Sequence, residues 1–135
     1  MFYPIAIEIG GPDQAFGVEV PDIPGCFSAG DTMDEAIANA REAIDGHLAI
    51  LADDNAEIPI ASTVEHYLRH PDFAGRIWAV VEVDLARYLG KAEKVNVTLP
   101  VRLTHRIDRY VARHPQYSRS GFLAEAALEK LAADA

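Results

Sequence analysis

The chain has 135 residues, half of them apolar, and a formal net charge of −9. This length suits one or two small domains, and the apolar content is enough for a packed core and too high for disorder. No apolar run approaches the length of a membrane span, and the first residues lack the basic start of a signal peptide. We therefore expect a cytoplasmic protein with no membrane partner. The single cysteine, Cys26, excludes an internal disulfide.

Charge is divided unevenly along the chain. Residues 1–90 contain 16 acidic and 4 basic residues, net −12, whereas residues 91–135 contain 5 acidic and 8 basic residues, net +3. This division indicates two different partners, a basic one for the first part and an anionic one for the second. An acidic surface can also serve solubility alone, so charge by itself does not decide between these interpretations.

The acidic part predicts an antiparallel sheet with one long helix. FYPIAIEIG and AFGVEV flank a GGPDQ turn and predict a hairpin, and CFSAG predicts a short third strand. Thr32 and Glu35 form a T-x-x-E capping box, and the apolar residues that follow recur at helical spacing over 31–55. RIWAVVEVDL, at 76–85, predicts another strand. Together these elements predict an α+β fold.

A short helix is predicted between the long helix and the last of these strands. Ser62 and Glu65 form a second capping box, and Pro71 ends the helix. His66 and His70 lie four residues apart on it, which is a spacing found in metal sites. No third ligand is evident, so we interpret them as a solvent-exposed pair and expect no metal ion and no cofactor.

The strand predicted at 94–99, after a linker at 89–93, has two different faces. With a period of two, its apolar side chains fall on one face, and Lys94, Asn96 and Thr98 fall on the other. These polar groups are of the kinds that read base edges in the major groove of DNA. An ordinary half-solvated edge strand is the alternative interpretation.

Two helices are predicted to follow this strand. Pro100 suits the start of the first, the HPQY run at 114–117 ends it, and Ser118 or Ser120 caps the second. A row of arginines lies beside the apolar face of the first helix, and we interpret this row as a solvated surface. The start of the second helix offers free backbone N–H groups to a phosphate, and Arg119 adds charge there.

One strand and two helices are too few to enclose a core without a second copy, a disulfide or a metal. Pairing the strand with its twin in an antiparallel ribbon directs the apolar face into a four-helix core shared by two chains. The polar face then points outward from a ribbon that fits the major groove.

Over 94–132, KVNVTLP followed by a helix and SRSGFLAEAALEKL resembles the ribbon-helix-helix repressors. The resemblance implies that Lys94, Asn96 and Thr98 contact bases. It also implies that three residues at the start of the second helix hold the DNA backbone: Ser118, Arg119 and Ser120.

The segment VEVPDIPGCFSAGDTMDEAIANAREAI, at 18–44, resembles the HicB antitoxins through P-D-x-P-G-C-x-S-x-G-D-T and the EA-rich helix. With the ribbon-helix-helix part, the resemblance covers nearly the full chain. It implies a partial RNase H-like antiparallel sheet with one long helix at 1–88, a linker at 89–93 and a ribbon-helix-helix dimerisation domain at 94–135. The implied partners are a small basic HicA-type mRNA-cleaving toxin, operator double-stranded DNA and a second copy, with higher oligomers left open. The implied function is toxin neutralisation and autorepression.

Catalysis is not expected. Glu8, Glu19, Glu82 and Asp84 lie on predicted strands and could converge on two metal ions, as nuclease chemistry requires. Acidic residues are so frequent here that chance supplies such a set. The alternative function is a stand-alone ribbon-helix-helix repressor whose acidic domain senses a small ligand, and it requires a pocket that the sequence does not show.

Overall fold

The computed structural model describes residues 1–134 and divides the chain into two compact units, unit 1 (Met1–Val83) and unit 2 (from Asp84 onward). The division lies ahead of residue 88, the predicted end of the first domain. The reason is that a 3₁₀ helix, η2 (Leu85–Tyr88), packs against α4 (Arg119–Ala133) of unit 2. No helix among the described residues is long and apolar enough to cross a membrane.

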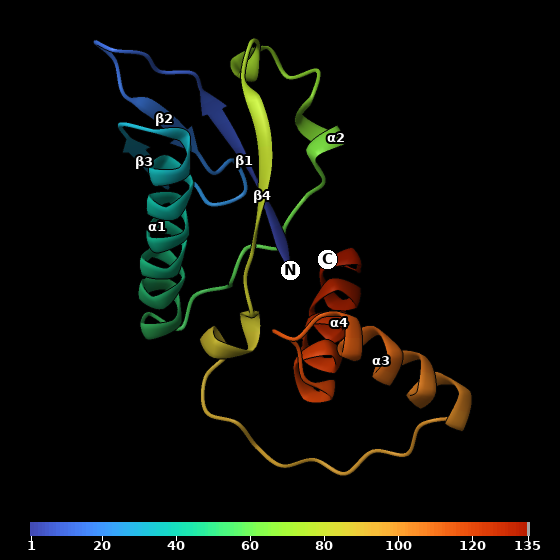
Figure 1. The fold of residues 1–135 in the computed structure, drawn as a ribbon. Helices are drawn as coiled ribbons and strands as arrows, with labels where there is room; N and C mark the ends of the chain where they lie inside the picture. Colours follow the sequence, from blue (N-terminus) through green and yellow to red (C-terminus); the bar gives the residue numbers. More distant parts are fainter. Residues whose placement is uncertain (135) are drawn as a thin grey trace. The chain divides into compact units, whose positions relative to one another are not determined.

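Unit 1 is built on a four-stranded sheet in the order β3-β2-β1-β4, with every neighbouring pair antiparallel (Figure 1). The strands are β1 (Phe2–Glu8), β2 (Phe16–Glu19), β3 (Phe27–Gly30) and β4 (Ile77–Glu82). Residues 3–7 of the central strand β1 are all buried, so both faces of the sheet are covered here. The predicted α+β fold with an antiparallel sheet is confirmed.

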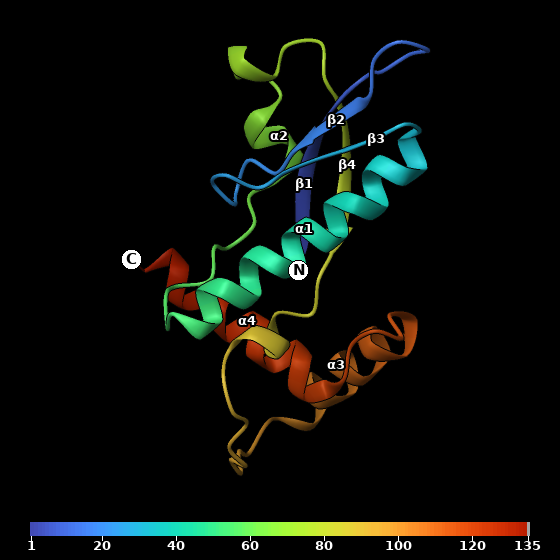
Figure 2. The same cartoon turned by 90° about the vertical axis from the view of Figure 1, so that its left-hand side faces the viewer.

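Helix α1 (Met33–Asp53) covers one face of the sheet (Figure 2). The Thr32 hydroxyl accepts a hydrogen bond from the backbone N–H of Glu35 at 3.1 Å, as the first capping box predicts. Gly30 of β3 permits close packing, because a Cβ there would lie 2.4 Å from the backbone nitrogen of Ala36. The helix buries residues at spacings of four: Ala36, Ala40, Ile44 and Leu48.

The opposite face of the sheet is covered at β4 by α2 (Val64–Tyr67). Tyr67 stacks on Trp78 with ring centroids 5.8 Å apart and an angle of 8° between the ring planes. Phe73 of the 3₁₀ helix η1 (Pro71–Phe73) packs edge-on against both rings. The short helix is therefore held in place by its aromatic contacts with the sheet.

The second capping box was assigned to the wrong residue. Thr63, and not Ser62, caps α2, and its hydroxyl accepts from the backbone N–H of His66 at 3.2 Å. The backbone N–H of Ser62 instead donates to the Asp22 carboxylate at 2.8 Å. Ser62 is therefore held by a long-range hydrogen bond that sequence spacing does not reveal.

Asp22 fastens the α2 segment to the turn between β2 and β3. Its second carboxylate oxygen accepts a hydrogen bond from the Tyr67 hydroxyl at 2.5 Å. Burial, followed by the hydrogen bond to Asp22, raises the pKa of Tyr67. The turn itself is closed by a hydrogen bond from the Val20 N–H to the Cys26 carbonyl at 3.0 Å, and Gly25 supplies the positive φ of 81° that it requires.

Unit 2 consists of η2 and two helices, α3 (Val101–Arg113) and α4. Residues 92–100 have no regular secondary structure in the single chain. The strand predicted at 94–99 is thus not formed here, because a strand requires a hydrogen-bonded neighbour. Few side chains of unit 2 are buried: Leu85, Tyr88, Ile107 and Tyr117.

Replacing Asp22 with alanine should destabilise the protein by about 1–3 kcal/mol, because two donors at the edge of the core then lose their shared acceptor. Tyr67→Phe, which loses only one of the two hydrogen bonds, should cost less. Urea unfolding measures both effects. Asp13→Ala, in an exposed turn, is the control and should leave the free energy of unfolding unchanged.

The same contact predicts a pH dependence. A raised tyrosine pKa means that folding favours the neutral phenol, so its contribution is complete below the ordinary value of 10.0 and is lost as pH rises through the raised value. Tyr67→Phe should therefore remove part of the alkaline loss of stability. Equal alkaline unfolding curves for the two proteins would contradict this.

Candidate functional site

The segment 94–100 precedes α3 in unit 2, and it carries two apolar side chains with high exposed fractions. Val95 is 67% exposed and Val97 is 65% exposed, and the polar residues that alternate with them, Lys94, Asn96 and Thr98, are also exposed. Large apolar groups at such exposure mark contact sites when they lie close together. The segment therefore presents an apolar row and a polar row, and the single chain covers neither.

The start of α4 holds the second set of predicted DNA contacts. Ser118 is the N-cap, and its hydroxyl accepts from the backbone N–H of Gly121 at 3.0 Å. This resolves the two alternatives, because Ser120 lies inside the helix. Lys94, Asn96 and Thr98 lie on the extended segment, and Figures 1 and 2 show that segment apart from the start of α4. The single chain therefore does not bring the two sets of residues together.

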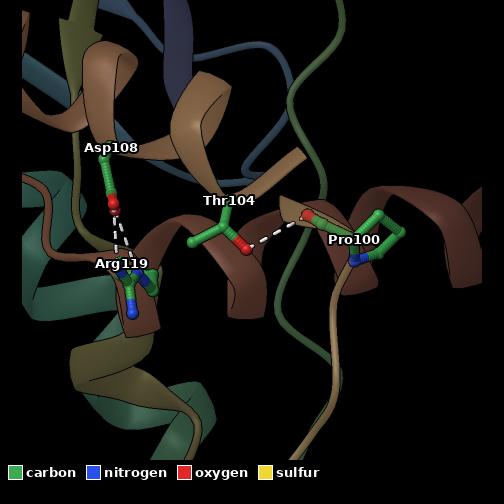
Figure 3. A network of polar contacts seen from close by, with 4 residues as sticks. All are labelled: Pro100, Thr104, Asp108 and Arg119. Atoms are coloured by element: carbon green, nitrogen blue, oxygen red, sulfur yellow. Dashed lines mark hydrogen bonds and ion pairs between the residues drawn. The ribbon is translucent and has the colours of Figure 1, made fainter. Parts of the chain in front are cut away.

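Arg119 is paired within unit 2. Its Nε donates to Oδ1 of Asp108 on α3 at 3.0 Å, and its Nη2 donates to Oδ2 at 2.8 Å (Figure 3). The guanidinium hydrogen bonds hold the pKa of the Asp108 carboxyl below its ordinary value. This pair links α3 to α4 and directs Arg119 toward α3. Asp108 was not predicted as a site residue, although it is the one acidic residue of α3 and lies beside the arginine row.

The start of α3 follows from Pro100. The Pro100 carbonyl accepts the first backbone hydrogen bond of the helix, from the Thr104 N–H at 3.0 Å, and a second bond from the Thr104 hydroxyl at 3.3 Å (Figure 3). The arginine row of this helix is exposed along its full length, as expected of a solvated face: Arg102, Arg106, Arg109 and Arg113.

The carboxylates considered for nuclease chemistry are divided between the two units. Glu8 and Glu19 lie on one face of the sheet of unit 1, whereas Asp84 belongs to unit 2 and caps η2 by accepting from the Ala86 N–H at 3.1 Å. Within residues 1–134, no group of three or more His, Cys, Asp or Glu side chains could hold a metal ion.

The two histidines of the predicted pair and the single cysteine contribute to capping and packing of the fold. His70 Nδ1 accepts from the Asp72 N–H at 3.3 Å and caps η1, and its ring packs against Phe73. His66 packs edge-on against Tyr67. Cys26 is buried, and burial raises the pKa of its thiol, which favours the protonated form over the reactive thiolate.

Charge is separated between the two units. Unit 1 contains 15 acidic and three basic residues, net −12, and unit 2 contains six acidic and nine basic residues, net +3. Unit 1 thus has the electrostatic character of a surface for a basic partner, and unit 2 that of a surface for an anionic one.

Comparison with known proteins gives several close relatives. The chain is 47% identical to an uncharacterised 14.9 kDa protein of the rep-hol intergenic region of Haemophilus phage HP1, covering 97% of this chain and 98% of that one. It is also 47% identical to the Burkholderia pseudomallei antitoxin HicB, whose crystal structure superposes with a TM-score of 0.75 over 97% of this chain and 98% of that one.

A third relative belongs to a complex. A chain of the HicA3 and HicB3 toxin-antitoxin complex is 33% identical, has a TM-score of 0.54, and matches 62% of this chain and 99% of its own length. The sequence model of the HicB-like antitoxins of bacterial toxin-antitoxin systems matches residues 3–127. Because this match spans nearly the whole chain, the protein belongs to the HicB-like antitoxin family of bacterial toxin-antitoxin systems.

Proposed function

We propose that this antitoxin has two separable activities. Its acidic domain binds and neutralises a small basic HicA-type toxin that cleaves mRNA. Its C-terminal domain pairs with a second copy as a ribbon-helix-helix and binds operator DNA, which represses the operon encoding both proteins. These activities place the protein in the cytoplasm, and the exposed apolar row of residues 94–99 is the observation that carries the proposal for DNA binding.

Toxin binding is assigned to unit 1. The matched chain of the HicA3 and HicB3 complex aligns over 99% of its own length with 62% of this chain. Unit 1, Met1–Val83, makes up the same share of the chain. A net charge of −12 favours association with a basic protein that itself binds RNA, because long-range attraction raises association rates. The strand order β3-β2-β1-β4, with α1 between the third and fourth strands, supports a truncated RNase H-like fold for this unit.

Dimerisation is assigned to unit 2. Besides the valines of the extended segment, Val101 is 69% exposed, Leu103 is 42% exposed and Leu131 is 68% exposed. Pairing residues 94–99 with the same residues of a second copy would give the segment its missing strand neighbour. The same pairing would bury these apolar side chains against the helices of both copies.

DNA reading is assigned to the polar row of the ribbon. With the apolar row turned into the shared core, Lys94, Asn96 and Thr98 point outward in both copies, and a two-stranded ribbon fits the major groove. An amide such as Asn96 can pair with adenine through two hydrogen bonds, which gives sequence discrimination.

Backbone contacts are assigned to Ser118, Arg119 and Ser120 at the start of α4. Asp108 uses two of the five N–H donors of Arg119. The remaining donors can hold a phosphate while the pair stays intact. In this arrangement Asp108 sets the direction of the guanidinium.

Neutralisation is tested by growth rescue. We expect that inducing the small protein encoded beside this chain arrests growth and that supplying the full-length chain restores it. Asn96→Ala should restore growth equally well, because neutralisation belongs to unit 1. Growth arrest that the wild-type chain does not relieve would overturn the antitoxin activity and favour a stand-alone repressor.

In the same Asn96→Ala variant, the difference in binding free energy between operator and random DNA should shrink by about 1–3 kcal/mol per altered base contact. Electrophoretic mobility shift or fluorescence anisotropy with operator and random DNA measures this difference. Binding of both proteins should fall with salt, with a slope of about −0.9 in log K against log salt for each phosphate neutralised. Unchanged discrimination would show that residue 96 does not read bases.

Val97→Lys should prevent dimerisation, because a charge then replaces an apolar group of the shared core. Sedimentation measures the change in mass, and operator binding should be lost with the dimer. Asn96→Ala is the matched control. Asn96 is the neighbouring residue but lies on the polar face, so its replacement should leave the dimer intact. A dimeric Val97→Lys protein would exclude the proposed ribbon.

A further inference from the structure

The sheet of unit 1 has a flat surface that α2 leaves uncovered. In an antiparallel sheet, directly opposed residues share a face. Phe27 opposes Glu19, Glu19 opposes Ala6, and Ala6 opposes Trp78, so these four side chains form one row across all four strands. The Trp78 end of the row lies under Tyr67 of α2, whereas Phe27, at the other end, is 61% exposed.

A second row adjoins the uncovered end. Ala29 opposes Gly17, and Gly17 opposes Glu8. The Glu8 side chain lies over Gly17, because a Cβ at this glycine would be 3.8 Å from the Glu8 carboxylate and 3.9 Å from its Cβ. We name the resulting surface the Phe27 patch, which consists of Glu8, Gly17, Glu19, Phe27 and Ala29.

The Phe27 patch has the composition of a binding site for a basic protein. Among the Phe, Tyr and Trp side chains of residues 1–134, Phe27 has the largest exposed fraction. Aromatic anchors contribute much of the energy of protein interfaces. Glu19 lies directly opposite Phe27, and Glu8 lies in the adjoining row. No basic residue belongs to the patch, and its other two members, Gly17 and Ala29, are small. Apolar contact and negative charge are therefore presented together.

The outer face of α1 offers charge without a comparable apolar anchor. Half of its exposed residues are acidic, and Arg41 is its exposed basic residue. Ile50 is its one large apolar side chain with a high exposed fraction, 61%. A solvated helix face accounts for this pattern. The sheet surface is the better candidate because a carboxylate and an exposed aromatic ring lie directly opposite each other on neighbouring strands.

We propose that the Phe27 patch is the surface on which the basic toxin docks, with Phe27 inserted into an apolar site of the toxin and Glu8 and Glu19 facing its basic residues. This inference rests on the proposed function and specifies the site at which neutralisation occurs. Because Phe27 is on an edge strand and largely exposed, truncating it removes the anchor without opening a cavity in the core.

Calorimetric titration of the full-length chain with the purified small protein encoded beside it tests the proposal. Phe27→Ala should weaken binding by about 30-fold or more, as expected for an aromatic anchor. Ile50→Ala is the matched control, since it removes an equally exposed apolar side chain from α1, and it should change the affinity less than about threefold.

Charge reversal gives a second, independent test. Glu19→Lys and Glu42→Lys change the net charge equally, but only Glu19 belongs to the patch, and Glu42 is exposed on α1. Glu19→Lys should slow association more than Glu42→Lys does, and the difference should shrink as salt is raised. Ala29→Arg, which adds bulk and positive charge at an exposed position, should also block binding while the unfolding midpoint stays unchanged.

The outcomes separate this inference from the proposed function. Tight binding by the wild type with equal affinities for Phe27→Ala and Ile50→Ala would overturn the docking surface and leave the antitoxin activity standing. Failure of the wild-type chain to bind would overturn both. A loss of oligomeric mass in Phe27→Ala, with toxin binding retained, would show that the patch joins copies of this chain and would also overturn the proposal.

Discussion

Unit 2 is shaped by a shortage of internal contacts. A helix pair and one 3₁₀ turn bury few side chains, and the segment ahead of α3 leaves Val95 and Val97 about two-thirds exposed. Such exposure is unfavourable in water, and the segment also lacks a strand neighbour for its backbone hydrogen bonds. Both deficits have the same remedy, which is pairing with an identical segment. The arrangement proposed for DNA binding follows from this constraint.

Unit 1, in contrast, has many internal contacts, since its central strand is buried on both faces. Helix α1 covers one face through a row of small and branched side chains, and the aromatic contacts of Tyr67 and Phe73 cover the Trp78 side of the other. Asp22 holds this second layer in place through two hydrogen bonds. What remains uncovered is the end of the sheet at β2 and β3, and this is where acidic and aromatic side chains meet.

Regular secondary structure was largely predictable from local patterns. Short apolar segments bounded by turn residues predicted the four strands of the sheet, and the Thr32 cap with its helical periodicity predicted α1. Local patterns were insufficient where a distant residue decides the outcome. Ser62 has the right spacing for a cap, but its N–H is bound by Asp22, forty residues away in sequence, and Thr63 takes its place. Arg119 was predicted from its charge, yet its direction depends on Asp108 of another helix.

The sequence by itself determined the two-part organisation of charge, the antiparallel sheet with its long helix, and the family resemblance, because these depend on composition, periodicity and short motifs. The tertiary structure decided which surfaces are left open. Phe27 lies within the P-D-x-P-G-C-x-S-x-G-D-T motif, but at a position where the motif specifies no residue. Its exposure follows only from the strand order and from the position of α2 over β4. Strand order and long-range hydrogen bonds depend on contacts between residues far apart in the chain, and local sequence patterns do not encode them.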